Sequence, residues 1–335
     1  MTRFFYGASQ EEFPPEELLR QSAAAAAAGF DGISSSDHLQ PWWEPGESGH
    51  TWPWLGAVGQ LVPSLPIGTG VTPAAARYHP ALIAQAWMTL ERMFPGRPFL
   101  GIGSGEALNE VPIGDDWPSP GDQVRRMEEA LGFIRRLWDG ETITEQGGFY
   151  TLKDAKLHTL AERRPPIWVS AFGPRAAAVA GRYGDGLWTL PDPESTPEVI
   201  EAYQAARREA GERSGDEGSA RGSGEIVFQA LVSWAETDEQ ALEAARKWKG
   251  SQPKETYRDD IHVPRQVSER GERETSDEEL VSSAIIGADP AMHAERLREL
   301  EGMGATIIVL QNNSGADPMG AIRVYGESVL PRLRE

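Results

Sequence analysis

Short apolar runs alternate with segments of helical spacing along most of the chain. In residues 125–138, for example, Met127, Leu131 and Ile134 recur at the spacing of one helix face. The apolar runs are predicted as strands at 4–8, 31–36, 65–71, 98–103, 166–171, 185–189, 225–234 and 306–310. Each predicted strand is followed by a helical segment, and this alternation predicts a parallel (β/α)8 barrel.

The predicted helices lie at 14–28, 51–60, 80–94, 125–138, 174–183, 196–211, 238–248, 290–303 and 318–330. A doubly wound sheet would alternate in the same way, but the G-x-G-x-x-G turn that opens such a fold does not follow the first strand. We therefore expect one barrel domain over residues 1–335.

Three segments fall outside the alternation. Residues 139–160 are predicted as an insertion that carries a hairpin around Gly147 and Gly148. Residues 214–224 are predicted as a Gly/Ser-rich loop. Residues 249–280 are polar and charged, and they are predicted as a long irregular excursion, part of a lid-like insertion over 249–282.

Composition narrows the class of protein. The 335 residues are 39% hydrophobic and 25% charged, as in soluble globular proteins. The net charge of −19 disfavours binding to nucleic acids or anionic membranes. The absence of cysteine excludes thiolate catalysis, disulfides and cysteine-ligated metals. No apolar run has the length of a signal-peptide core or a membrane span, so we expect a cytoplasmic protein.

Residues 33–43 carry the first candidate chemistry. Asp37 and His38 follow the second predicted strand, and catalytic residues of barrel enzymes lie at the carboxyl ends of strands. An imidazole beside a carboxylate suits a general base, because the carboxylate can fix its tautomer. The alternative is a helix-capping Asp37 beside an exposed His38. A metal site is less favoured, because the other histidines show no H-x-H or H-x-x-x-H spacing.

Other strand ends lead to the same rim of the predicted barrel. Residues 101–110 end the fourth strand with Gly101-Ile-Gly-Ser-Gly and deliver Glu106 and Asn109, and residues 68–73 end the third strand with glycines. Residues 171–175 end the fifth strand at a helix start, where backbone N–H groups can hold an anion. Each could also be an ordinary turn. We expect the four tryptophans at positions 42, 43, 52 and 54 to line a pocket.

Together these motifs resemble coenzyme F420-dependent glucose-6-phosphate dehydrogenases, which belong to the luciferase-like superfamily of barrel oxidoreductases. The resemblance is carried by residues 36–42, 68–71 and 103–110, and it extends to residues 77–80, 180–186 and 330–333. It implies coenzyme F420 at the barrel mouth, a small-molecule substrate and a homodimer.

The resemblance also implies roles for individual residues. His38 matches the catalytic histidine, Trp42 the tryptophan beside the reacting centre, and Glu106 the carboxylate near the deazaflavin. On this basis His38 takes the proton of a substrate hydroxyl, although Glu106 could be the base instead. A cis peptide bond is expected between Gly70 and Val71. The implied cofactor contacts are Asp37, Gly70, Val71, Ser104, Gly105, Glu106 and Asn109, with Ala171, Phe172, Gly173 and Pro174 at the phosphate.

The chain departs from the sugar-phosphate dehydrogenases where they bind phosphate. Pro193, Arg258 and Ser283 stand at the positions of their basic residues, so only one of the three is basic. Lys254 or Arg265 could compensate. A doubly charged phosphate with a single Arg partner is poorly held, so we favour an uncharged alcohol or unphosphorylated sugar. Glucose 6-phosphate, an FMN-dependent monooxygenase, a metal-dependent hydrolase and a non-catalytic binding barrel are the alternatives.

Overall fold

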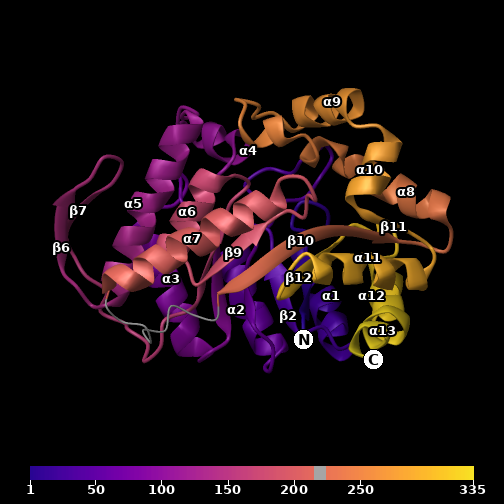
Figure 1. Cartoon of the computed structure of the whole chain (residues 1–335), viewed down its shortest axis with the longest axis horizontal. Coiled ribbons are helices and arrows are strands. Elements are labelled where there is room, and N and C mark those ends of the chain that lie inside the picture. The colour runs from indigo at the N-terminus through magenta and orange to yellow at the C-terminus, as the bar shows by residue number, and fades with distance from the viewer. Residues whose placement is uncertain (215–223) are drawn as a thin grey trace.

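Eight parallel strands form a closed barrel in the residues that the computed structural model describes, 1–214 and 224–335. The barrel closes because β12 pairs with both β1 and β10, and β10 also pairs with β9 (Figure 1). Its strands are β1 (Arg3–Ala8), β2 (Gly32–Ser35), β3 (Ile67–Thr69), β5 (Pro98–Gly103), β8 (Ile167–Ser170), β9 (Gly186–Thr189), β10 (Glu225–Trp234) and β12 (Ile307–Asn312). The predicted (β/α)8 fold is confirmed.

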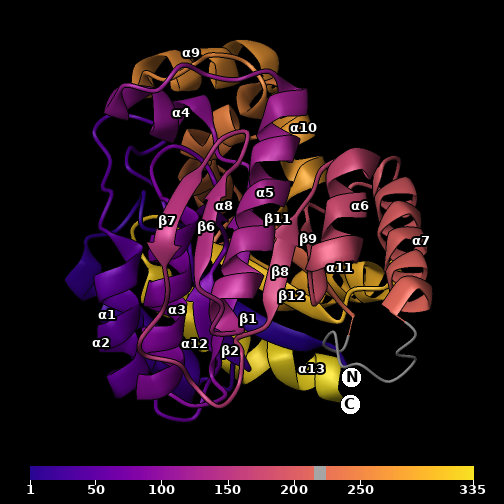
Figure 2. The same ribbon diagram turned by 90° about the vertical axis from the view of Figure 1, so that its left-hand side faces the viewer.

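Helices surround this barrel (Figure 2). They are α1 (Pro15–Ala27), α2 (Thr51–Leu61), α3 (Pro80–Met93), α5 (Pro120–Trp138), α6 (Pro174–Tyr183), α7 (Thr196–Ser214), α8 (Asp238–Arg246), α11 (Pro290–Gly302), α12 (Pro318–Val324) and α13 (Leu330–Arg334). Helix α5 begins five residues earlier than predicted, because Ser119 caps it and Pro120 fits its first turn. The predicted final helix is interrupted by a π-helical turn, Tyr325–Val329.

Aromatic side chains fill the inside of the barrel. Phe99 stacks on Trp168 with ring centroids 4.3 Å apart, and Trp188 belongs to the same cluster. Towards the carboxyl rim, Gln229 accepts a 3.2 Å hydrogen bond from the indole of Trp188 and donates one of 2.7 Å to Gln311. The lumen is thus a packed core, as in other barrels of this kind, whose ligand sites lie at the carboxyl rim.

The prediction of an irregular stretch over residues 249–280 is wrong. The segment contains η3 (Lys254–Tyr257), α9 (Pro264–Glu274) and α10 (Asp277–Ser283), after the short turn η2 (Lys247–Ser251). Its helices bury only narrow faces, which explains the low apolar content. In α9, Gly271 packs so closely that an added Cβ would lie 2.3 Å from the backbone nitrogen of Gly250. Ser276 and Glu279 form a capping box at the start of α10.

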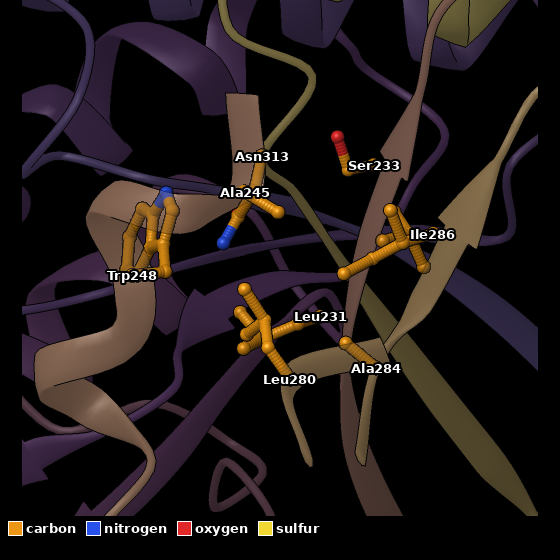
Figure 3. Close-up of a pocket in the computed structure, with 9 residues that line it drawn as sticks. Leu231, Ser233, Ala245, Trp248, Leu280, Ala284, Ile286 and Asn313 are labelled. Carbon is orange, nitrogen blue, oxygen red and sulfur yellow. The ribbon is translucent and has the colours of Figure 1, made fainter. Parts of the chain in front are cut away.

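The segment 249–282, which we call the cover segment, lies at the rim end of the barrel with α4 (Ala107–Glu110) (Figure 1). Gln40 donates a 2.9 Å hydrogen bond to the carbonyl of His262, and the Ser268 hydroxyl donates to the carbonyl of Trp42. Leu280, in α10 of the cover segment, lies beside Leu231 of β10 among apolar side chains (Figure 3).

The remaining elements are short. Strands β6 (Ile143–Gln146) and β7 (Thr151–Ala155) pair antiparallel, β4 (Thr72–Pro73) and β11 (Ile285–Gly287) flank the barrel strands, and η1 (Val111–Ile113) follows α4. Most of the loop predicted over residues 214–224, namely residues 215–223, lies outside the described residues. Within the described ranges, none of the helices has the length and apolar character needed to span a membrane.

Candidate active site

The imidazole of His38 lies between two carboxylates at the carboxyl rim of the barrel. Its Nε2 is 3.4 Å from Oε1 of Glu11 and 3.5 Å from Oε2 of Glu106. Glu11 follows β1, His38 follows β2 and Glu106 follows β5, so three strand ends meet at this point. The side chain of His38 is 10% exposed, which leaves an edge open at the rim. The structure therefore brings together the predicted imidazole and carboxylate.

Asn109 fixes which imidazole nitrogen can exchange a proton. Its Oδ1 accepts hydrogen bonds from the backbone N–H groups of Leu39, at 2.7 Å, and Gln40, at 3.1 Å. Its amide nitrogen therefore points the other way, 3.2 Å from Nδ1 of His38, and donates to Glu106 at 3.1 Å. Nδ1 also lies 3.2 Å from the carbonyl oxygen of Gln40. With Nδ1 enclosed in this way, Nε2 is the nitrogen available for chemistry.

Glu106 is arranged to hold a proton more readily than a carboxyl in water. Burial raises its pKa, and the negative charge of Glu11 raises it further, while His38, Arg77 and the Asn109 hydrogen bond act in the opposite direction. Its side chain is 20% exposed, so it still reaches the mouth. A carboxyl of this kind can exchange protons with a neighbouring imidazole.

Glu11 is a site residue that sequence reasoning missed. Its side chain is 1% exposed, its Oε2 accepts a 2.6 Å hydrogen bond from the Ser36 hydroxyl, and its Oε1 faces His38. The available signal was positional: Glu11 follows the first strand as Glu106 follows the fourth predicted strand. It was obscured because Glu11 stands beside Glu12, close to the acidic residues that open the next predicted helix.

The expected role of Asp37 in orienting the imidazole is wrong. Its Oδ2 accepts hydrogen bonds from the hydroxyl of Thr72, at 2.7 Å, and the indole of Trp52, at 3.1 Å, and its Oδ1 accepts one from Tyr78, at 3.1 Å. Adjacent residues of an extended chain point to opposite sides, so its carboxylate faces away from His38. The alternative of a capping Asp37 beside an exposed imidazole is also wrong, because both side chains are largely buried.

Glycines form a tightly packed floor at the ends of β3 and β5, on the same rim as these groups. The peptide bond between Gly70 and Val71 is cis, as expected. A Cβ on Gly70 would lie 2.5 Å from the ring of Trp188, and one on Gly103 would lie 2.8 Å from Cγ2 of Val71. Val71 is half-buried above the packed lumen. The floor thus combines an apolar side chain with closely packed backbone.

The four tryptophans after β2 have different environments. The ring centroid of Trp42 lies 5.0 Å from that of His38. Trp43 packs edge-on against Trp248, and Trp52 binds Asp37. Trp54 belongs to the core between barrel and helices, so the expectation that it lines a pocket is wrong. The helix that begins at residue 51 turns Trp54 inward.

The start of α6 lies at the end of β8 and matches the predicted anion position. Gly173 is the N-cap residue and provides no side-chain hydrogen bond to the helix, and Pro174 opens the first turn. The first-turn N–H groups therefore lack a side-chain partner, which suits a phosphate. Ala171 is buried and Phe172 is 37% exposed. Across the rim, Ser104 is half-buried and Gly105 has a positive φ of 84°.

The positions that differ from the sugar-phosphate dehydrogenases lie at the edge of the rim. Pro193 is exposed, and the Ser283 hydroxyl donates a 3.0 Å hydrogen bond to Gln252. Arg258 is exposed, and its carbonyl accepts a 2.8 Å hydrogen bond from the indole of Trp117.

The two lysine or arginine residues considered as compensating cations already have acidic partners. Lys254 donates to the carboxylate of Asp192, whose pKa falls to about 2 because of this hydrogen bond. Arg265 lies 3.7 Å from Glu269, one turn further along α9. Lys254 is therefore occupied, whereas the exposed pair of Arg265 with Glu269 is weak.

The family model described as luciferase-like monooxygenase matches residues 1–306. The chain belongs to this luciferase-like family. An F420-dependent glucose-6-phosphate dehydrogenase of Microbacterium testaceum (strain StLB037) is 37% identical over 99% of this chain and 98% of its own length. An F420-dependent hydroxymycolic acid dehydrogenase of Mycobacterium tuberculosis is 33% identical over 97% of this chain and 87% of its own.

A solved structure also resembles the whole chain. An F420-dependent secondary alcohol dehydrogenase, solved in complex with an F420-acetone adduct, matches with a TM-score of 0.92 and 29% sequence identity. The match covers 100% of this chain and 99% of the other. The likeness therefore extends over the segments outside the barrel as well as over its strands and helices.

Proposed function

We propose that this protein is an F420-dependent dehydrogenase that transfers a hydride between a substrate carbinol and the deazaflavin. The observation that carries the proposal is the position of His38 Nε2 beside Glu106, at the rim where β2, β3 and β5 end. The similarity to F420-dependent dehydrogenases over nearly the full length of the chain supports it.

The residues at the rim fit such a cofactor. Half-buried Val71 offers an apolar surface to a planar ring, and the α6 N-terminus offers N–H groups to a phosphate. When bound, F420 supplies the ring carbon that accepts or returns the hydride. The residues we propose to hold it are Asp37, Gly70, Val71, Ser104, Gly105, Glu106 and Asn109, with Ala171, Phe172, Gly173 and Pro174 at the phosphate. Because its carboxylate has protein partners, Asp37 would contribute mainly by holding the rim in place.

The catalytic roles follow from the geometry of His38. Its Nε2 takes the proton of the substrate hydroxyl during oxidation and returns it during reduction. Glu106, 3.5 Å away, exchanges a proton with this nitrogen and places charge near the ring system. Trp42 packs against the imidazole and excludes water from the reacting centre.

An uncharged alcohol or unphosphorylated sugar is the substrate that we favour. Lys254 is paired with Asp192, which leaves Arg258 as the cation available to a phosphate at the positions Pro193, Arg258 and Ser283. Glucose 6-phosphate is the second candidate, because the 37% identical relative is a glucose-6-phosphate dehydrogenase.

We also propose that the protein is cytoplasmic and dimeric, with residues 1–335 as one domain and the insertions 139–160 and 249–282 on it. The resemblance to the family supports this. Light scattering on the purified protein measures the assembly directly: a homodimer has twice the chain mass of 36.6 kDa, and a mass of one chain contradicts it.

The loss of F420 fluorescence on mixing with sugars, sugar phosphates and secondary alcohols tests the function. We expect turnover that depends on F420. The variant His38→Ala should bind F420 with wild-type affinity and lose most of its turnover, because Nε2 is removed while the floor and the α6 N-terminus are kept. Full activity of His38→Ala would refute its role. Tight binding of FMN with no binding of F420 would instead favour the monooxygenase alternative.

A further inference from the structure

The guanidinium of Arg77 lies between the two chain segments that carry His38 and Glu106. Arg77 follows β4, and its side chain is only 9% exposed. On one side, its Nη2 donates a hydrogen bond to the carbonyl of Asp37, the residue before His38, and lies 3.3 Å from Oδ1 of Asp37. On the other side, its Nε lies 3.8 Å from Oε1 of Glu110. One largely buried cation therefore contacts both segments.

Glu110 connects this cation to Glu106 through the short helix α4. Glu106 is the N-cap residue of α4, and the backbone N–H of Glu110 donates a 3.1 Å hydrogen bond to the carbonyl of Glu106. The carboxyl group of Glu110 also accepts, at Oε2, a 2.7 Å hydrogen bond from the backbone N–H of Arg77. Both oxygens of Glu110 thus face Arg77. If this contact is lost, the start of α4 is freed to move, and Glu106 moves with it.

The bond to Asp37 fixes the other segment. The peptide group that contains the Asp37 carbonyl continues into His38, so a displaced carbonyl reorients the backbone from which the imidazole extends. The amide of Asn109, also in α4, lies 3.2 Å from Nδ1 of His38 and donates to Glu106. Arg77 and Asn109 therefore tie the same two segments together at separate points.

Arg77 also acts on Glu106 through its charge. The groups that interact with Glu106 in its titration are Glu11 after β1, His38 after β2, Arg77 after β4, Asn109 and Glu110 of α4, and Tyr257 of η3. Burial is the largest effect and raises the pKa of Glu106, whereas the charge of Arg77 lowers it. A guanidinium stays protonated at the pH values where enzymes work, so this effect of Arg77 is permanent.

We propose that Arg77 is a positioning residue for the hydride-transfer reaction, because it braces the segments that carry His38 and Glu106 and so sets the contact between these two side chains. This inference rests on the proposed function, since it concerns the same reaction. Arg77 acts through the backbone of Asp37 and through Glu110. What it maintains is the 3.5 Å separation between Nε2 of His38 and the Glu106 carboxylate, across which the proton is exchanged.

Two variants separate the geometry of Arg77 from its charge. Arg77→Met removes both, so kcat should fall by about tenfold or more with a much smaller change in F420 affinity. The acidic limb of its pH–rate profile should move to higher pH, because Glu106 loses a neighbouring cation. Arg77→Lys keeps the charge, but one ammonium cannot replace the planar fork that reaches both segments. Its kcat should fall while its acidic limb stays at the wild-type pH.

The loss of F420 fluorescence measures these rates. Cyclohexanol, glucose and glucose 6-phosphate are the substrates tested, and the one with the highest wild-type kcat/KM is used for all variants. Wild-type kcat in both variants, or an unmoved acidic limb in Arg77→Met, overturns the inference and leaves the F420-dependent function standing. Failure of the wild-type protein to bind F420 overturns the proposed function and the inference with it. If Arg77→Met does not fold, wild-type kcat in Arg77→Lys overturns the inference.

Arg97→Met provides the matched control. The Arg97 guanidinium is half-buried and donates 2.8 Å hydrogen bonds to the carbonyls of Gly59 and Leu65, at the amino end of the barrel. This variant should lower the melting temperature, measured by differential scanning fluorimetry, and leave kcat and the acidic limb unchanged. Equal losses of kcat in Arg97→Met and Arg77→Met would assign both to general destabilisation and overturn the inference.

Infrared titration tests the charge effect on the protein without F420. The C=O stretching band of the protonated Glu106 carboxyl is assigned by its absence in Glu106→Gln. In Arg77→Met this band should persist to higher pH than in wild type, because the missing cation no longer favours the ionised form. In Arg77→Lys and Arg97→Met it should disappear at the wild-type pH. The same titration in Arg77→Met and wild type contradicts the inference, whatever the activity.

Discussion

The contact between β3 and β5 beneath the site gives a sharp prediction for Gly101→Ala. A Cβ at Gly101 would lie 2.0 Å from the carbonyl oxygen of Thr69 and 3.2 Å from Cγ1 of Val71. The Thr69 hydroxyl donates a 2.9 Å hydrogen bond to the carbonyl of Gly101, so the strands cannot separate without losing this bond. The obstacle is backbone, which cannot rotate away as a side chain can. The end of β3 must therefore shift by about 1 Å to accept the methyl group.

The expected cost is about 1–3 kcal/mol of unfolding free energy, the range for overpacked cores. The melting temperature should fall by about 1–4 °C, because the entropy of unfolding of a chain of 335 residues is large. Because the shifted segment continues into Gly70 and Val71, F420 affinity should fall as well. Differential scanning fluorimetry and F420 fluorescence titration measure the two effects on one sample.

Gly132→Ala provides the matched control. A Cβ at Gly132 meets nothing within 4 Å, and the residue lies within α5. Alanine favours the helix by about 0.5–1 kcal/mol, so this variant should be slightly more stable than wild type and bind F420 normally. Equal melting temperatures for the two variants, or wild-type F420 affinity in Gly101→Ala, would refute the packing argument.

Three further predictions concern charges and hydrogen bonds. Burial raises the pKa of Glu110 from its usual 4.5 to about 7, so the folded state holds this proton more tightly than the unfolded state. The free energy of unfolding should therefore fall by about 3 kcal/mol as pH rises from about 4.5 to about 7. Glu110→Gln should remove this part of the pH dependence, measured by denaturant unfolding at several pH values. The same pH dependence in wild type and variant would contradict the prediction. Glu11→Gln should lower the pKa of Glu106 and move the acidic limb of the pH–rate profile to lower pH; an unmoved limb counts against the coupling. Trp52→Phe removes a hydrogen-bond donor to the buried carboxylate of Asp37 and should lower the free energy of unfolding by about 1–3 kcal/mol. A denaturant midpoint equal to that of the wild type would contradict this prediction.

Local pattern was enough to predict the barrel and the place of its chemistry. Strand and helix periods are properties of short windows of sequence, and strand–helix alternation leaves few folds. Once the strands are parallel, their carboxyl ends must share one rim, so His38, Glu106 and Asn109 were expected near one another. The structure places them within hydrogen-bonding or ion-pair distance.

The direction of individual side chains at the rim was decided by tertiary packing. Asp37 is next to His38 in sequence, yet its carboxylate faces Thr72 and Tyr78, whereas Glu11 reaches the imidazole from another strand. No spacing rule contains this information, because it depends on how loops from different strands pack against each other.

The cover segment shows the same limit on a larger scale. Its helices bury little apolar surface of their own and gain stability from contacts with the rest of the barrel, so their sequence resembles that of a loop. Tyr257 reaches Trp42 and Phe172 only because this segment is folded over the mouth. The sequence by itself determined the barrel and the rim; the tertiary structure decided which side chains close the site, since those contacts join residues that no local pattern relates.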